Sequence, residues 1–486
     1  MTKKKVKKSI PIGDNLDGER HILKLTDSRY IQILIFLTIS AFFLRFYNLG
    51  FNSLWLDEAS TNMVALKSFS EIWQIMVAGE FNPPLFYWME HIIVMIFGNS
   101  EFALRFLPAI FGIATIPLIY LVGTEFRNKN VGIIAASIFA FSPFLIIYSQ
   151  EARAYSAMLF FITASLVFYF KALKTNDIKQ WILFGVLSAL ALWSHFYAFV
   201  MIASCMIYAL MMHLKDIKQD INYIKPFIVS TLIFGILSLP LFVVIIDLFA
   251  KRTSTAPTYG IQGTGVIWET FIQISGYSDL LMYIFMLLFA LGVVQAFFVD
   301  KERATFLIWS VISVFIVSYF LSFKIPMIPR YLQFLTIIFF IGIAMSYRMF
   351  YTIKPSRGVI YGMIIFFMIL SVPFSMNYYS QESKTDWRGF SQILEKNTKP
   401  GDYVVYVPAY LFLPTEYYYS NKTDGTITYQ VTTGKDLDII QKNGNSIYYV
   451  MTGDALASDP TGSSRDWLQK NTKLINQHGE IYLFVR

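Results

Sequence analysis

About eleven apolar segments of bilayer-spanning length, or close to it, recur between residues 30 and 375 of this chain. A helix needs about 20 mainly apolar residues to cross the hydrocarbon core of a membrane, and a helix satisfies its own backbone polar groups there. The pattern therefore predicts an α-helical polytopic membrane protein. The segments are Tyr30–Tyr47, Glu101–Glu125, Val131–Tyr148, Tyr155–Leu173, Trp181–Trp193, Phe196–Met212, Pro226–Phe249, Leu280–Val299, Thr305–Ser322, Tyr331–Tyr347 and Gly358–Ser375.

The composition excludes several other classes of protein. Of the 486 residues, 55% are hydrophobic and 15% are charged, whereas soluble domains carry about 25% charged residues. The hydrophobic content argues against a disordered chain, and a single cysteine, Cys205, excludes a disulfide-stapled scaffold. The sequence has no cysteine cluster, no H-E-x-x-H and no P-loop, so it predicts neither a metal site nor a nucleotide site.

The formal net charge of +8 is explained mostly by membrane topology. Basic residues recur in every second loop, as the positive-inside rule requires of cytoplasmic loops. The lysine run at Lys3–Lys8 precedes no signal-peptide core, so we expect an uncleaved cytoplasmic tail over residues 1–29 and no nucleic-acid partner. An odd number of spans places the C-terminus outside the cytoplasm, and we expect the plasma membrane of a prokaryote.

Three regions are expected outside, namely a first loop at 48–100, a second loop at 250–279 and the tail at 376–486. Within the first loop, Phe69–Val77 and Pro84–Phe97 read as interfacial helices. The transmembrane domain is expected over 30–375. The tail alternates strand-like and helix-like runs, which predicts a small α/β domain. Its expected strands are Tyr403–Val407, Thr426–Val431, Ile447–Met451 and Ile481–Val485, and its expected helices are Trp387–Asn397, Asp436–Lys442 and Arg465–Asn471.

Two adjacent carboxylates, Asp57 and Glu58, directly follow the first span. A carboxylate at the outer membrane surface could take the proton of a hydroxyl or amine acceptor during attack. Taken alone, the pair is better explained as helix capping, with Asp57 as the N-cap and Glu58 favouring the helix dipole.

Basic residues gather at the same predicted face from distant parts of the sequence. Glu151 and Arg153 lie between the third and fourth spans, and Arg105 begins the second. Arginine suits a phosphate because its planar fork donates paired hydrogen bonds, although an ion pair or a snorkelling side chain would explain each residue alone. The further candidates at this face are His195, Lys251, Arg252, Arg330 and Tyr331. Their convergence favours a site for a phosphate-bearing lipid.

These motifs together resemble the polyprenyl-phosphate-sugar-dependent glycosyltransferases of the GT-C class. The group that they resemble most is family 39, the relatives of dolichyl-phosphate-mannose protein mannosyltransferase. The resemblance rests on Asp57-Glu58, Arg105 with Pro108-Ala109, Gln150-Glu151-Ala152-Arg153 and Arg330-Tyr331. It covers roughly residues 30–375, and the stretch from Asp386 to Asp402 resembles the outer domain of many uncharacterised members.

The resemblance implies transfer of a sugar, mannose or another hexose, from a polyprenyl-phosphate donor to a protein, lipid or glycan acceptor on the extracytoplasmic face. It makes Asp57 the general base, with Glu58 in a supporting role. It assigns the donor phosphate to Arg105 and Arg153, with Arg330 and the pair Lys251-Arg252 as further ligands. Many relatives have a histidine before Pro-Pro, where this chain has Asn82, so the need for a divalent metal stays open.

Three other classes remain as alternatives. A transporter or lipid flippase would need ionisable residues near the bilayer midplane or two related halves. A polysaccharide polymerase or ligase would lack the first-loop acidic pair at this position. A receptor whose outer domain binds a ligand would leave the gathered charges unexplained.

Overall fold

The computed structural model describes residues 26–217, 221–254, 257, 259–352, 357–381, 384–419, 427–430, 437, 446–453, 459 and 462–486. The lysine run at Lys3–Lys8 and nearly all of Asp436–Lys442 lie outside the described residues. The chain divides into two compact units. The first comprises Met1–Tyr47, Ser70–Met89 and Phe106–Met376, and the second comprises Asn48–Phe69, Glu90–Arg105 and Asn377–Arg486.

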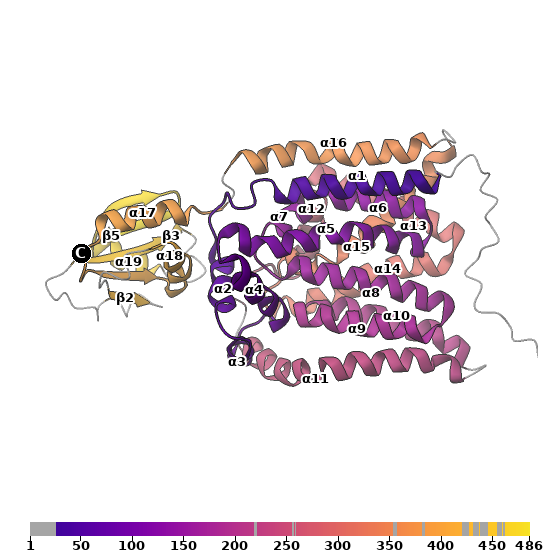
Figure 1. The fold of residues 1–486 in the computed structure, drawn as a ribbon, viewed down its shortest axis with the longest axis horizontal. Helices are drawn as coiled ribbons and strands as arrows, with labels where there is room; N and C mark the ends of the chain where they lie inside the picture. The colour runs from indigo at the N-terminus through magenta and orange to yellow at the C-terminus, as the bar shows by residue number, and fades with distance from the viewer. Residues whose placement is uncertain are drawn as a thin grey trace, which may run out of the picture. The chain divides into compact units, whose positions relative to one another are not determined.

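Long apolar helices run side by side in the first unit (Figure 1). Seven helices in the described part of the chain are long and apolar enough to cross a membrane. They are α1 (Asp27–Phe46), α5 (Glu101–Phe126), α8 (Tyr155–Thr175), α11 (Lys225–Thr253, reached through the 3-10 turn η2 at Ile221–Ile224), α13 (Asp279–Val299), α14 (Lys301–Leu321) and α16 (Gly358–Ser380).

An eighth crossing is built from two helices, α6 (Lys129–Phe141) and α7 (Pro143–Ser149), which meet at an angle of 60°. The break falls at Pro143, which cannot continue the preceding helix because it lacks a backbone N–H. The Ser142 side chain accepts a hydrogen bond from the Leu145 N–H and caps the second helix. The pair corresponds to the expected segment Val131–Tyr148.

The remaining helices between residues 69 and 352 do not meet the criteria for a spanning helix. Three coincide with expected spans, and α3 and α4 coincide with the expected interfacial helices, while α12 lies in the expected second outer loop. By length and apolar character the described helices supply seven or eight spans, so the expected number of eleven is not confirmed. These helices are α3 (Phe69–Ala78), α4 (Pro84–Phe97), α9 (Ile178–Ser194), α10 (Ala198–Ile217), α12 (Gly265–Ile274), α15 (Leu335–Met345) and the 3-10 turns η3 (Pro329–Leu332) and η4 (Ser346–Thr352).

Small residues let α13 and α15 approach closely. A Cβ atom placed on Gly292 would lie 1.7 Å from the carbonyl oxygen of Gly342, so no other residue fits there without moving a backbone. Such contacts are how helices pack in a membrane, where lipid is as apolar as the side chains. Every residue of α15 is buried.

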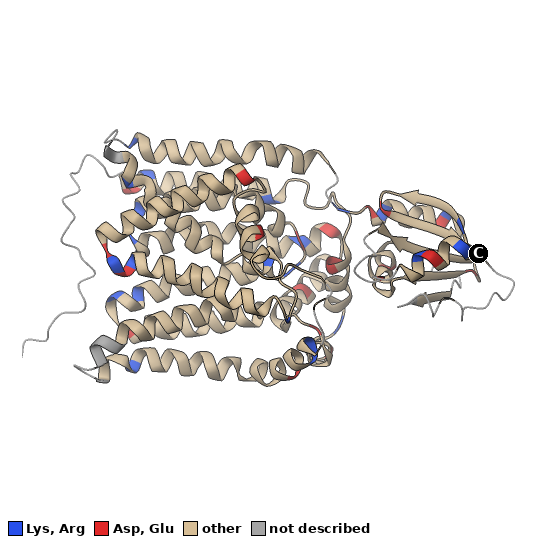
Figure 2. Ribbon diagram, turned by 180° about the vertical axis from the view of Figure 1, so that it is seen from behind, with Lys and Arg blue, Asp and Glu red and all other residues tan. Residues whose placement is uncertain are grey.

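Lysine and arginine residues of the first unit gather at one end of the helix bundle (Figure 2). This end holds Lys129 at the start of α6, Lys174 near the end of α8 and Lys301 at the start of α14. The arrangement agrees with the charge pattern from which the cytoplasmic loops are predicted.

The second unit contains a five-stranded sheet in the order β2-β1-β3-β5-β4. Strands β1, β2 and β3 are parallel, and β5 pairs antiparallel with both β3 and β4. The four expected strands are present, while β4, with its alternating polar residues, was not expected. The strands are β1 (Tyr403–Val407), β2 (Ile427–Gln430), β3 (Ile447–Thr452), β4 (Lys473–His478) and β5 (Ile481–Val485).

Helices cover both faces of this sheet, and alternate residues of β1 supply the two cores. Val405 packs with Leu468 of α19 (Ser463–Asn471) on one face. Val404 packs with Phe390 of α17 (Trp387–Asn397) on the other, beside the turn η5 (Ala409–Leu411) and α18 (Phe412–Tyr418). The predicted α/β domain is thus a three-layer arrangement, and α17 has the predicted bounds.

Candidate functional site

The acidic pair lies in the first turn of α2 (Leu56–Ala65), which belongs to the second unit. The helix begins two residues earlier than the capping interpretation requires: Trp55 is the N-cap, and Asp57 is the second helical residue. That interpretation of Asp57 is therefore wrong, although both carboxylates still favour the helix dipole. Glu58 is completely buried, whereas Asp57 is only half-buried.

Glu58 forms a buried, two-pronged ion pair with Arg105. The Arg105 Nε donates to Oε1 at 2.8 Å, and Nη2 donates to Oε2 at 2.7 Å. The remaining guanidinium N–H groups donate to the backbone carbonyls of Leu49 (3.0 Å), Asn52 (2.8 Å) and Ser53 (2.9 Å). Guanidinium has five N–H donors, so all of them are used within this unit.

This saturation bears on the predicted role of Arg105 as a phosphate ligand. A phosphate would have to displace either Glu58 or a carbonyl of the segment 49–53, and each displacement would leave a buried polar group unpaired. In this structure Arg105 instead fixes the segment that leads into α2. We therefore do not retain Arg105 among the donor-binding residues.

A second cation, Lys384, reaches the same carboxylate from the segment that precedes α17. Its Nζ lies 3.0 Å from the Glu58 Oε2, and the lysine side chain is 10% exposed. The Glu58 Oε2 also accepts a hydrogen bond from the Trp55 N–H at 3.3 Å. Glu58 is thus held by two cations and the helix N-terminus, which suits a positioning role.

Further contacts join the C-terminal domain to the start of the first loop. The Ser53 hydroxyl donates to Asp386 at 3.0 Å, and the Leu54 N–H donates to the Tyr418 hydroxyl at 2.8 Å. His478 lies 2.8 Å from the other Asp386 oxygen. Burial alone would raise the pKa of Asp386, but hydrogen bonds from the Gly389 N–H, His478 and Ser53 outweigh it and lower the pKa.

Glu90 of α4 is an unusual buried acid in this unit. Its side chain is fully buried, and neither carboxylate oxygen has a hydrogen-bond partner among the described residues. Burial alone raises the pKa of Glu90 well above the usual carboxyl range. A lone buried carboxyl of this kind is stable only in its protonated form.

The first unit gathers five of the predicted site residues. Glu151 and Arg153 lie in the short connection between α7 and α8 and are 6% and 9% exposed. Arg330 of η3 lies over the ring of Tyr331 at 5.9 Å, and the ring centroid of His195 lies 5.6 Å from that of Tyr331. Two further aromatic residues, Tyr155 and Tyr197, complete this cluster. We call these seven residues the tyrosine–arginine cluster.

His195 in this cluster is neutral. Burial and the nearby charges of Arg153 and Arg330 lower the pKa of His195 to about 3. The Tyr197 N–H donates to Nδ1 at 3.3 Å, which places the single ring proton on Nε2. His195 can therefore donate one hydrogen bond to an anion but adds no positive charge.

Two residues with no assigned role hold the connection between α7 and α8 in place. The Gln150 side-chain amide donates to the backbone carbonyls of Arg45 (3.1 Å) and Tyr47 (2.9 Å). The guanidinium of Arg45, completely buried at the end of α1, donates to Ser149 at 3.1 Å and to the Ala140 carbonyl at 3.1 Å. An arginine inside an apolar helix is costly, so its presence in α1 is itself evidence that this part of the structure serves a function.

Lys251 and Arg252 lie at the end of α11, and Arg252 is close enough to Tyr197 of the tyrosine–arginine cluster to interact with it electrostatically. Lys251 pairs with Asp247 one helical turn away at 2.7 Å, and both side chains are more than half exposed. Arg252 donates to the Tyr259 hydroxyl at 3.0 Å and lies over the ring of Phe81 at 4.8 Å. Among the described residues, no group of three or more His, Cys, Asp and Glu side chains could hold a metal ion.

Known proteins match parts of this chain in sequence. Residues 82–239 match the family model of dolichyl-phosphate-mannose-protein mannosyltransferase. An uncharacterized protein of Aquifex aeolicus is 30% identical over 140 residues, 27% of this chain and 28% of that protein. Undecaprenyl phosphate-alpha-4-amino-4-deoxy-L-arabinose arabinosyl transferase 2 of Proteus mirabilis is 34% identical over 111 residues, 22% of this chain and 20% of that protein. The matches span about a quarter of these relatives.

Solved structures match over nearly the whole chain. ArnT from Cupriavidus metallidurans in the apo state gives a TM-score of 0.63 at 11% identity, covering 94% of this chain and 98% of that protein. The oligosaccharyltransferase AglB from Archaeoglobus fulgidus, in complex with an inhibitory peptide and a dolichol-phosphate, gives 0.54 at 13% identity, covering 93% and 74%. At such identities the likeness shows the fold. The family model and the fold confirm the resemblance to the GT-C class of glycosyltransferases.

Proposed function

We propose that this chain is a membrane glycosyltransferase that moves a sugar from a polyprenyl-phosphate donor to an acceptor on the extracytoplasmic face. The observation that carries the proposal is the pair of arginines in the tyrosine–arginine cluster, the buried Arg153 and the half-buried Arg330, beside a neutral histidine. Arginines in such a place suit a phosphate. ArnT has also been solved bound to undecaprenyl phosphate, with a TM-score of 0.62, 10% identity, and coverage of 94% of this chain and 98% of that one.

The proposed reaction is direct displacement at the anomeric carbon. An acceptor oxygen or nitrogen attacks C1 of the sugar, the C1–O bond to phosphate breaks, and the electron pair leaves with the polyprenyl phosphate. The arginines stabilise the additional negative charge on that phosphate. The proton of the acceptor goes to Asp57.

Asp57 suits the role of base better than Glu58 does. Both Glu58 oxygens are engaged by Arg105, Lys384 or the Trp55 N–H, and the side chain is inaccessible. Asp57, one position earlier and half-buried, can be reached by an acceptor.

The decisive test is incubation of membranes that contain the full chain with polyprenyl-phosphate sugars, hexose and pentose in separate reactions. Mass spectrometry of the protein, lipid and glycan fractions would identify the glycosylated product. We expect transfer from at least one donor, lost in the Asp57→Asn variant. Absence of transfer from every donor, with folded protein present, would refute the proposal.

A further inference from the structure

A buried glutamine, Gln333, follows Tyr331 of the tyrosine–arginine cluster by two positions and has no role in the reaction proposed above. It is 1% exposed, and its amide nitrogen has no hydrogen-bond partner among the described residues. Its backbone carbonyl, by contrast, accepts hydrogen bonds from the N–H and the hydroxyl of Thr336, at 2.9 and 2.6 Å. The unpaired group therefore belongs to the side chain.

An unpaired buried amide is costly to a fold. Moving an amide from water into apolar surroundings without a hydrogen bond is unfavourable, and most buried polar groups in proteins have a partner. Gln333 is flanked in the sequence by two completely buried apolar residues, Leu332 and Phe334. A leucine or methionine at position 333 would avoid the cost. A glutamine is favoured there only if a ligand supplies the missing acceptor.

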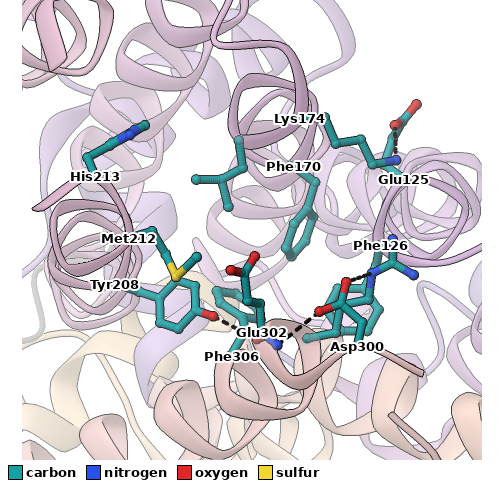
Figure 3. A pocket seen from close by; sticks show the side chains of 12 residues that line it. Glu125, Phe126, Phe170, Lys174, Tyr208, Met212, His213, Asp300, Glu302 and Phe306 are labelled. Carbon is teal, nitrogen blue, oxygen red and sulfur yellow. Dashed lines mark hydrogen bonds and ion pairs between the residues drawn. The ribbon is translucent and has the colours of Figure 1, made fainter. Parts of the chain in front are cut away.

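The charged side chains at the basic end of the bundle differ in this respect. A pocket at that end is shown in Figure 3, and Lys174, which lines it, lies at the other end of α8 from Tyr155 of the cluster. The Lys174 Nζ is 3.0 Å from the Glu125 Oε2, and the Arg303 Nε is 3.2 Å from the Asp300 Oδ2. These side chains are paired within the protein, so they give no comparable sign of a ligand.

Gln333 lies one turn beyond Arg330 in the same helical segment. Its φ of −51° and ψ of −33° continue the 3-10 turn η3. Side chains three positions apart in a 3-10 helix lie one above the other, so Arg330 and Gln333 share one side of the turn. At about 2.0 Å per residue they are roughly 6 Å apart along the axis. The chain then enters α15, which is buried throughout, so Gln333 lies on the interior side of Arg330.

This order matches the order of groups in a polyprenyl-phosphate sugar, in which the phosphate joins the sugar to the hydrocarbon chain. We propose that Gln333 is a further donor-binding residue: its amide N–H donates a hydrogen bond to the phosphate from the side of the hydrocarbon chain, while Arg330 contacts the same phosphate from the outer side. The inference rests on the proposed function. A neutral amide suits this depth, because it pairs with a phosphate oxygen without placing a second charge in apolar surroundings.

The test measures binding directly and does not require transfer. The full chain is purified in detergent, and its unfolding temperature is followed during titration with undecaprenyl phosphate or with undecaprenol, which has the same chain but no phosphate. A ligand that binds the folded protein stabilises it according to its Kd. We expect the wild type to prefer the phosphate. Gln333→Met should raise the Kd for undecaprenyl phosphate roughly tenfold, the scale of one hydrogen bond to a charged group, and should leave the Kd for undecaprenol unchanged.

Two further measurements separate binding from structural support. Without lipid, Gln333→Met should unfold at the wild-type temperature or above it, because methionine is of similar size and has no amide to leave unpaired. Gln180→Met is the matched control: its amide oxygen is likewise buried and unpartnered among the described residues, but it lies at the opposite end of α9 from His195. This control should keep the wild-type Kd for both lipids.

The outcomes distinguish this inference from the proposed function. If the wild type prefers undecaprenyl phosphate and Gln333→Met keeps the same Kd, the proposed function stands and the role of Gln333 is refuted. A lower unfolding temperature of Gln333→Met without lipid would also refute it, since the amide would then be paired inside the protein. If the wild type shows no preference for the phosphate, the proposed function itself fails, and this inference fails with it.

Discussion

The Lys384 ammonium lies 3.0 Å from a carboxylate oxygen of Glu58, although 326 positions separate the two residues in the sequence. The contact ties the segment leading into α17 to the helix that carries the acidic pair. Arg105 contacts the same carboxylate: its Nη2 lies 2.7 Å from the Glu58 Oε2. The segment that leads into the C-terminal domain is therefore in contact with α2, and we propose that this contact positions Asp57.

Lys384→Met should separate this positioning role from a purely structural one. Glu58 keeps Arg105 as a partner, so the loss of one partly buried cation should cost about 1 to 3 kcal/mol of stability. We expect slower transfer with an unchanged KM for the donor, and recovery of the rate in Lys384→Arg. The measurements are transfer kinetics and thermal unfolding in detergent. Lys396→Met, an exposed site on α17, is the control and should change neither.

Substitution of Arg105 should act on folding rather than on donor binding. Arg105→Lys replaces five directed N–H donors by one ammonium and leaves carbonyls of the segment 49–53 unpaired. Each buried carbonyl left unpaired costs about 1 to 3 kcal/mol. We expect a large fall in unfolding temperature, with the surviving enzyme binding donor normally. A raised KM for the donor with unchanged stability would restore Arg105 as a phosphate ligand.

The two members of the acidic pair should respond differently to neutralisation. Asp57→Asn should reduce transfer by about 100-fold or more, the range of a positioned general base, with an unchanged unfolding temperature. Glu58→Gln should lower the unfolding temperature, because Arg105 and Lys384 then lose the negative charge that they share. Measuring both quantities in both variants distinguishes base from positioning residue. If Asp57→Asn transfers at a near-normal rate, Asp57 is not the base.

Much of this fold is readable from the sequence because lipid imposes simple rules on spanning helices. The helix α17 was predicted to the residue, since Asp386 caps it and Asn397 ends its amphipathic pattern. The strand β4 was missed, because it lies at the sheet edge and its polar side chains give no burial signal. The α6–α7 pair was read as one straight span although Pro143 signals a break.

Only part of the candidate site could be predicted from the sequence. The sequence located Glu151, Arg153 and Arg330, since ionisable residues at the ends of apolar segments stand out. It did not indicate that the guanidinium of Arg105 is saturated by backbone carbonyls, because such partners have no sequence signature. Lys384 was missed for a similar reason: nothing local marks a lysine in a polar linker as the partner of a glutamate more than 300 positions away.

Arg153→Ala should weaken donor binding selectively. Loss of one charge-assisted hydrogen bond to phosphate costs about 1.5 to 3 kcal/mol, so the donor KM should rise roughly tenfold or more. The acceptor KM should stay unchanged. Lys251→Ala is the matched control: this residue is exposed and paired with Asp247, and we expect no effect on either KM. Donor and acceptor titrations check this prediction, and an equal rise in both constants would contradict it.

Glu90 should make the stability of this protein depend on pH. Its pKa is raised by burial in the folded state, so above the usual carboxyl pKa the folded protein keeps a proton that the unfolded chain has lost. Stability contributed by this group is present at low pH and falls as the pH rises toward the folded pKa. Glu90→Gln imitates the protonated acid and removes that dependence. The unfolding temperature of the variant should therefore exceed that of the wild type by a margin that grows as the pH rises above the ordinary carboxyl pKa of about 4.3. Glu71→Gln, an exposed change on α3, should follow the wild-type curve, and parallel curves for wild type and Glu90→Gln would show that Glu90 is not a lone protonated acid.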